Sequence, residues 1–189
     1  MYSAAPARKP NPLKKFIRTH LIERTLQGLP KSNHVLDLGT GYGFYLSINP
    51  HAWAVDGDHN CINYLKSKGF NVKQCDFLKR LPFDDDEFEY VIAHDVLEHF
   101  TYEELELIFC EVHRILKRDG HFLIFVPNKN GYELGLRTEA GHKLFVTNTE
   151  VKSLSKELFV IKKNYSEPLP RWVGKFFNHN KEIFELVKQ

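Results

Sequence analysis

Short apolar runs alternate with amphipathic segments along the chain. Most of the runs end in a glycine, an acid or a proline, which is typical of strands buried in a parallel sheet. The runs are HVLDLG (34–39), AWAVDG (52–57), FNVKQCD (70–76), EYVIAHD (89–95) and HFLIFVP (121–127). Between the second and third runs, residues 59–69 carry Ile62 and Leu65 at helical spacing and end in Gly69, which predicts a helix.

Two capping boxes predict where later helices begin. The segments TYEE (101–104) and TNTE (147–150) have the T-x-x-E spacing in which threonine and glutamate side chains satisfy the first backbone groups of a helix. Apolar residues recur at helical spacing after the first box until Asp119-Gly120, so we expect that helix to end there. The second helix is expected to run through about Glu157.

Two apolar runs at the end of the chain have no helical pattern between them. They are LFVIKKNYS (158–166) and EIFELVK (182–188), and both predict strands. Strands that alternate with helices build a parallel sheet with the helices packed outside it. The pattern therefore predicts an α/β, doubly wound sheet with helices on both faces.

The composition is that of one globular domain. The 189 residues are 42% hydrophobic and 26% charged, and no apolar run approaches the about 20 residues of a membrane span. The N-terminus also lacks the apolar stretch of a secretory signal, so we expect a soluble, cytoplasmic protein. Cys61, Cys75 and Cys110 form no C-x-x-C pair and are expected to be reduced thiols.

Charge is unevenly distributed, although the net charge is only +2. Residues 1–34 carry seven basic residues and one acid, whereas residues 84–106 carry ten acids and neither lysine nor arginine. One interpretation is a solvated surface and a loose tail, with Asp84–Glu87 in an exposed turn. The other is a basic approach to an anionic substrate.

Candidate binding chemistry gathers where the first three predicted strands end. Gly39, Gly41 and Gly43 follow the first strand and let the backbone approach a ligand closely. Asp56 ends the second strand, where its carboxylate can accept hydrogen bonds from both ribose hydroxyls, and Asp76 ends the third, within reach of an adenine amino group. Acids at successive strand ends indicate a nucleoside-containing ligand, because ligands bind at the carboxyl ends of such sheets.

These residues resemble those of the class I S-adenosylmethionine-dependent methyltransferases. The resemblance spans residues 33–166 and rests on VLDLGTGYG, AVD, CDF, LPFDDDEFEYVIAHDVLEHF and RILKRDGHFLIFVPN in this order, within the subgroup whose fourth strand leads into VLEH. It implies a Rossmann-like, mostly parallel sheet of seven strands with an antiparallel last strand. It also implies S-adenosylmethionine as cofactor and S-adenosylhomocysteine as product.

The resemblance assigns roles to individual residues. The implied cofactor contacts are Gly39, Thr40, Gly41 and Gly43 with Asp37 around the methionine part, Asp56 and Gly57 at the ribose, Asp76 and Phe77 at the adenine, and His94 and Asp95 beside the methionine. A dinucleotide is disfavoured, because its G-x-G-x-x-G fingerprint requires glycine where Phe44 stands. The first helix is expected to be short, because Asn49-Pro50 interrupts it.

One domain over residues 1–189 is expected. Its parts are a basic tail with an N-terminal helix (1–30), a cofactor-binding core (33–166), and a lid-like segment with the last strand (167–189). Residues 13–29 form an amphipathic pattern that can close over the cofactor.

The predicted function is methyl transfer, by in-line displacement, to an oxygen or nitrogen of a small molecule. An anionic acceptor is one of the options. His142 and His99 are the candidate general bases, with surface and helix-capping roles as the alternatives. Trp172 and Phe176 are candidate substrate contacts or core residues. No metal is predicted, since no carboxylate and amide cluster of the catechol type stands out.

Two other functions remain open. The fold can serve a cofactor-binding or regulatory protein without turnover. An RNA methyltransferase is less favoured, because an N-P-P-Y-like sequence is lacking after the fourth strand and the acids of residues 84–106 would repel a phosphate backbone.

Overall fold

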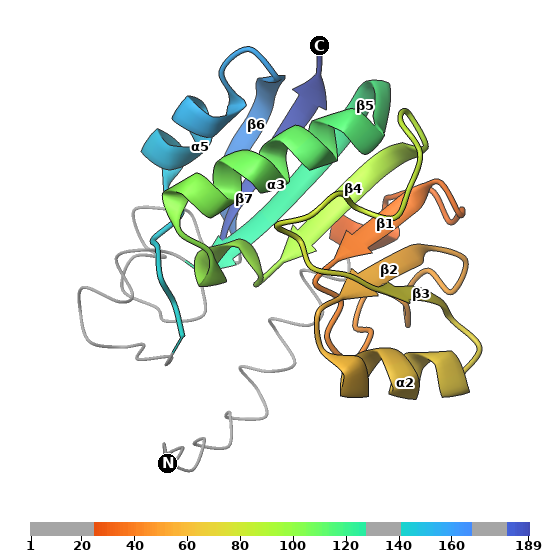
Figure 1. The fold of residues 1–189 in the computed structure, drawn as a ribbon. Helices are drawn as coiled ribbons and strands as arrows, with labels where there is room; N and C mark the ends of the chain where they lie inside the picture. The colour runs from red at the N-terminus through yellow and green to blue at the C-terminus, as the bar shows by residue number, and fades with distance from the viewer. Residues whose placement is uncertain (1–24, 128–140, 168–180) are drawn as a thin grey trace, which may run out of the picture.

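The computed structural model describes residues 25–127, 141–167 and 181–189 of the chain (Figure 1). Its elements are β1 (Val35–Leu38), β2 (Trp53–Asp56), α2 (His59–Ser67), β3 (Asn71–Gln74), β4 (Phe88–His94), η1 (Leu97–His99), α3 (Tyr102–Ile115), β5 (Leu116–Pro127), α5 (Asn148–Ser155), β6 (Phe159–Glu167) and β7 (Lys181–Lys188). None of the helices in these described ranges is long and apolar enough to span a membrane.

The strands form a single mixed sheet in the order β3-β2-β1-β4-β5-β7-β6. Strands β1 to β5 pair in parallel, whereas β7 is antiparallel to both β5 and β6. The seven-stranded sheet with an antiparallel last strand is therefore confirmed. The strand order reverses between β1 and β4, and ligands bind at such a switch point in doubly wound sheets.

Alternating side chains of the strands divide the core between the two faces of the sheet. Leu36 and Leu38 of β1 belong to one apolar cluster with the buried faces of α3 and α5, whereas Val35 belongs to a second cluster with α2. Figure 1 shows α3 and α5 lying across the same face of the sheet. Since strand side chains point alternately to opposite faces, both faces must be covered. Helices on both faces are confirmed.

Both capping boxes form, but the helices end earlier than predicted. Thr101 and Thr147 each accept a backbone hydrogen bond and each pairs with its glutamate. Helix α3 ends at Ile115, not at Asp119-Gly120, because Leu116 is already extended and pairs with Phe88 of β4. Asp119, with a φ of 60°, lies in an irregularity of β5. Pairing with the sheet thus replaces the last predicted helical turn.

The expected first helix is absent from its place after the glycines. Residues 41–48 form successive turns, although the N–H groups of Ser47 and Asn49 each bond a carbonyl four residues earlier. The buried Asn49 amide donates to the carbonyls of Pro30 and Ser32, both at 3.3 Å. These bonds tie the segment to the chain before β1, and Pro50 ends any helical continuation.

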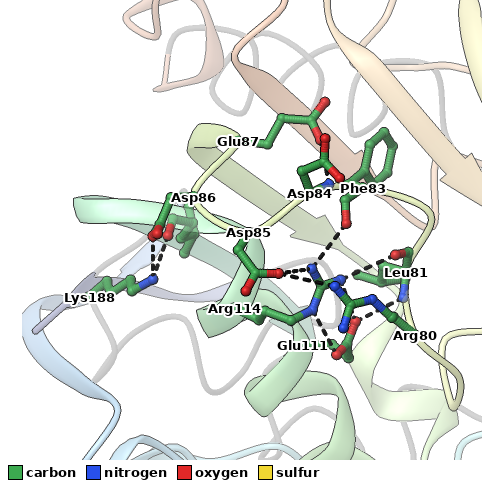
Figure 2. A network of polar contacts seen from close by, with 11 residues as sticks. Arg80, Leu81, Phe83, Asp84, Asp85, Asp86, Glu87, Glu111, Arg114 and Lys188 are labelled. Atoms are coloured by element: carbon green, nitrogen blue, oxygen red, sulfur yellow. Dashed lines mark hydrogen bonds and ion pairs between the residues drawn. The ribbon is translucent and has the colours of Figure 1, made fainter.

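The acidic turn before β4 is held by basic side chains (Figure 2). Asp85 accepts hydrogen bonds from Arg114 at 2.7 Å and from Arg80 at 3.2 Å, and Asp86 accepts one from Lys188 at 2.7 Å. Asp85 and Asp86 are exposed, so the prediction of a solvated turn is correct, but both are paired. The turn lies at the start of β4, whereas the switch point lies at its end. The charges of Asp85 and Asp86 are therefore compensated, and the turn is remote from the expected ligand.

Candidate active site

The glycine loop after β1 is held against the ends of β2 and β4. The N–H groups of Gly39 and Thr40 both donate to the Val55 carbonyl, at 2.9 and 3.1 Å. Gly39 has a φ of 76°, and a Cβ there would lie 2.4 Å from Cγ2 of Val96. A Cβ on Gly43 would similarly lie 2.5 Å from Leu65. These two glycines are needed for packing within the protein as well as for their backbone angles.

Gly41 is different, because a Cβ on this residue would meet no atom within 4 Å. Its N–H donates to Oδ2 of Asp56 at 2.8 Å, and Oδ1 of Asp56 accepts from the N–H of Asp58 at 2.8 Å. The carboxylate is half-buried, and each of its oxygens can accept further hydrogen bonds. Asp56 therefore fixes the loop and retains capacity for two ribose hydroxyls.

An open cavity beside Asp56 suits a flat ring. Its volume is about 420 Å³, and it is lined by Gly57, Gln74, Cys75, Asp76, Phe77 and Phe100. Asp76 is exposed and Phe77 is buried. The rings of Phe77 and Phe100 lie 6.0 Å apart, centre to centre. The predicted adenine residues Asp76 and Phe77 are thus brought together, and the structure adds Phe100, which no motif identified.

Asp37 and Thr40 supply polar groups at the other end of the site. With Gly39, Phe44 and His94 they line a small cavity of about 20 Å³. The Thr40 hydroxyl is buried beside the Asp37 carboxyl and makes no other hydrogen bond within the described ranges. The pKa of Asp37 is raised to about 7, mainly because the carboxyl is buried; a hydrogen bond with the Thr40 side chain opposes the rise, and the nearby Asp56 charge adds to it. Buried polar groups of this kind are ready to receive the charged methionine part of a cofactor.

Replacing Asp37 with asparagine is expected to remove a pH-dependent loss of stability. The folded pKa of about 7 exceeds the ordinary 3.8, so stability falls as pH rises from 3.8 to 7 and is level above that range. The wild-type free energy of unfolding should drop by about 4 kcal/mol more than that of the variant between acidic and neutral pH. Urea titrations across this range measure it, with the exposed Asp58→Asn as control. If the free energy of unfolding changed equally with pH in wild type and Asp37→Asn, the raised pKa of Asp37 would be contradicted.

His94 and Asp95 lie at the end of β4, as predicted. The His94 ring is 5.8 Å from the ring of Phe44, and its Nε2 is 3.8 Å from Oδ2 of Asp95. Asp95 has a φ of 56° and forms an ion pair with Lys181, whose side chain is buried. Sequence analysis did not single out Lys181, because its pairing depends on β7 lying beside β5.

The two candidate bases also come together. The rings of His99 and His142 are 4.9 Å apart, centre to centre, although 43 positions separate them in the chain. His99 is exposed and follows β4, whereas His142 is half-buried and follows β5. The candidate contacts Trp172 and Phe176 lie outside the described residues. The same is true of residues 13–24 in the expected N-terminal helix, but Leu26 is described and lines the small cavity beside Asp37.

Comparison with known proteins identifies the domain. A model of the methyltransferase domain matches residues 36–124. The tRNA (carboxymethyluridine(34)-5-O)-methyltransferase alkbh8 of Xenopus tropicalis is 33% identical over 127 residues, which are 61% of this chain and 20% of that protein. The probable tRNA methyltransferase 9B of Mus musculus is 30% identical over 108 residues, 56% of this chain and 24% of that protein. The chain thus spans about a quarter or less of these relatives.

Solved structures share the fold. A SAM-dependent methyltransferase from Archaeoglobus fulgidus aligns with a TM-score of 0.66 at 17% identity, covering 93% of this chain and 94% of its own. The magnesium protoporphyrin IX methyltransferase of Synechocystis PCC 6803, solved with bound SAH, aligns with a TM-score of 0.70 at 16% identity, covering 96% and 90%.

The residues at the switch point fit S-adenosylmethionine, the cofactor of this family. Asp56 and the cavity of Asp76 and Phe77 suit its adenosine, and the buried Thr40 hydroxyl and Asp37 suit its amino acid part. The sheet order, the glycine loop and the domain match agree on one family. Residues 36–124 match a methyltransferase domain, and the described part of the chain has the fold of the S-adenosylmethionine-dependent methyltransferases.

Proposed function

We propose that this chain transfers the methyl group of S-adenosylmethionine to an oxygen or nitrogen nucleophile of an RNA nucleoside. The observation that supports this reaction is the arrangement of residues at the switch point. The Gly41–Asp56 hydrogen bond and the cavity lined by Phe77 lie toward β2 and β3, and His94 lies at the end of β4. The His99–His142 pair follows the ends of β4 and β5. These residues would hold a bound cofactor, and its sulfonium would supply the methyl group.

The transfer needs alignment more than acid–base help. The nucleophile attacks the methyl carbon in line with the carbon–sulfur bond, which breaks and leaves its electron pair on sulfur. Holding the two reactants in line and excluding water supplies much of the acceleration. A hydroxyl nucleophile must also lose its proton, and we assign that proton to the imidazole of His142 or His99.

Two observations favour an RNA acceptor over the small molecule expected from the sequence. The relatives described above are named as tRNA methyltransferases, one of them acting on an oxygen of carboxymethyluridine. In addition, the electrostatic argument against RNA weakens, because Asp85 and Asp86 of the turn before β4 are paired with Arg114, Arg80 and Lys188, at the end of β4 away from the switch point.

A small-molecule acceptor is the second candidate. Glu103 and Glu104 begin α3, close after His99 in the chain, and Glu103 is exposed. Glu104 is paired with Lys143 at 3.0 Å, but Glu103 adds a negative charge that would repel a phosphate backbone. This local charge favours a compact acceptor without phosphates.

Labelled cofactor distinguishes the candidates. The chain is incubated with S-adenosylmethionine carrying a labelled methyl group, once with total RNA and once with an RNA-free metabolite extract. We expect label in the RNA fraction, and digestion with nuclease and phosphatase should release it as a labelled nucleoside. Label only in the metabolite fraction would favour the second candidate. No transfer in either mixture, together with calorimetric binding of the cofactor, would indicate a binding protein without turnover.

A further inference from the structure

Three metal-binding side chains meet where β4 and β5 end. Glu98 and His99 belong to η1, and His142 lies in the segment before α5. One carboxylate oxygen of Glu98 and one ring nitrogen of each histidine all lie within 4.8 Å of one another. Ligands at about 2.0–2.2 Å from a shared ion are at most about 4.3 Å apart. The three groups would therefore have to draw slightly closer together to bind one ion.

The backbone holds these side chains in register. The Glu98 carbonyl accepts hydrogen bonds from the N–H groups of Lys143 and Leu144, at 2.9 and 3.3 Å. These bonds join η1 to the segment that carries His142. Gly141 has a φ of 106°, which a residue with a side chain rarely adopts, and this turn brings His142 back toward His99.

His99 already makes the contact that orients metal-binding histidines. Its Nδ1 lies 3.2 Å from the carbonyl oxygen of Gly141. A ligating histidine commonly donates one ring N–H to a backbone carbonyl, which fixes its tautomer and directs the other nitrogen to the ion. With Nδ1 protonated in this bond, Nε2 of His99 carries the free lone pair.

Burial and exposure also suit an ion. The Glu98 side chain is only 3% exposed, and a cation next to a buried carboxylate offsets the cost of removing its charge from water. His99 is exposed, so one side of the cluster remains open to solvent. Sites that act on substrates keep such an open position.

We propose that Glu98, His99 and His142 bind one divalent transition-metal ion, with Zn²⁺ or Mn²⁺ as the expected ions. Two imidazoles with one carboxylate suit these ions better than Ca²⁺ or Mg²⁺, which prefer oxygen ligands. In the transfer, the ion would bind the acceptor hydroxyl and lower its pKa, and the released proton would pass to water on the open side of the cluster. The two histidines would then be ligands, and this role replaces the base role assigned to them above. That role rests on the proposed function, whereas binding of the ion does not.

Binding is tested with the metal alone, without cofactor or acceptor. The full chain is stripped with a chelator and titrated with Zn²⁺ by calorimetry, and with Co²⁺ by visible absorption. We expect one ion per chain, and at least a tenfold loss of affinity in His99→Ala and His142→Ala. His51→Ala, which removes an exposed histidine outside the cluster, should bind as the wild type does.

His99→Ala is decisive because its exposed side chain can be removed without disturbing the core, whereas Glu98→Gln changes a buried group. Failure of the wild type to bind an ion at micromolar concentration would overturn the proposal, as would wild-type affinity in both histidine variants. Ion binding without methyl transfer to any acceptor would leave the metal site standing and count against the proposed function alone.

Discussion

Replacing Asp56 with asparagine is expected to weaken the binding of S-adenosylhomocysteine by roughly 100-fold. The carboxylate already accepts hydrogen bonds from the N–H groups of Gly41 and Asp58, and it would also accept from the ribose hydroxyls. Hydrogen bonds to a charged group contribute about 1.5–3 kcal/mol each, and 2.7 kcal/mol corresponds to a factor of about 100. Asparagine has a single oxygen, and its NH₂ group would face one of these donors.

Isothermal calorimetry with S-adenosylhomocysteine measures the change. Asp58→Asn is the matched control, because it removes the same charge two residues away and asparagine still caps α2. Its affinity should stay within about threefold of the wild type, a difference below 1 kcal/mol. Equal losses in the two variants would mean that net charge near the loop, and not the position of the Asp56 carboxylate, governs affinity.

Arg114→Met is expected to lower the free energy of unfolding by about 3 kcal/mol. The guanidinium donates to both carboxylate oxygens of Glu111, at 3.0 and 2.8 Å, and to Asp85 at 2.7 Å. It also donates to the carbonyls of Phe83 and Leu81, at 3.0 and 3.2 Å (Figure 2). Methionine keeps the apolar stem but removes these five hydrogen bonds, and losing hydrogen bonds to part-buried and charged acceptors is costly.

Urea denaturation tests this prediction, and Arg80→Met provides the comparison. Arg80 pairs with the same Asp85, but its side chain is 70% exposed, so the expected loss is below about 1 kcal/mol. Arg114 holds the pKa of Asp85 and Glu111 below their ordinary values. The stability from these carboxylates is present above their unfolded pKa and is lost as pH falls through the folded one. The difference in free energy of unfolding between wild type and Arg114→Met should therefore become smaller in acid. A difference that does not change with pH would contradict the pairing.

Local signals predicted most of the fold. The apolar runs gave the seven strands, and each threonine–glutamate box marked a helix start to the residue. The ends of elements were predicted less well, because they depend on distant partners. Leu116 pairs with Phe88 of β4, although a helix was predicted to include it. Asn49 was predicted to end a helix, but its side chain donates to the carbonyls of Pro30 and Ser32. Neither partner can be read from the residues near it.

In the candidate site, too, local sequence predicted some residues, whereas contacts between distant segments could not be predicted. Asp56, Asp76 and the glycines were identified because each directly follows a strand, and a parallel sheet brings strand ends to one edge. The approach of His142 to Glu98 and the pairing of Lys181 with Asp95 depend on where β5 and β7 lie in the sheet. No spacing in the chain indicates either contact.

The succession of turns from Gly41 to Ile48 also determines the electric field at the amino acid end of the cofactor. An α-helix beginning there would align its peptide dipoles and place about half a positive charge at its N-terminus, where it favours a carboxylate. Turns lack this alignment over several residues. We therefore expect discrimination between the cofactor and analogues without the carboxylate to depend on individual side chains and N–H groups around Thr40, and to be weaker than at a helix N-terminus.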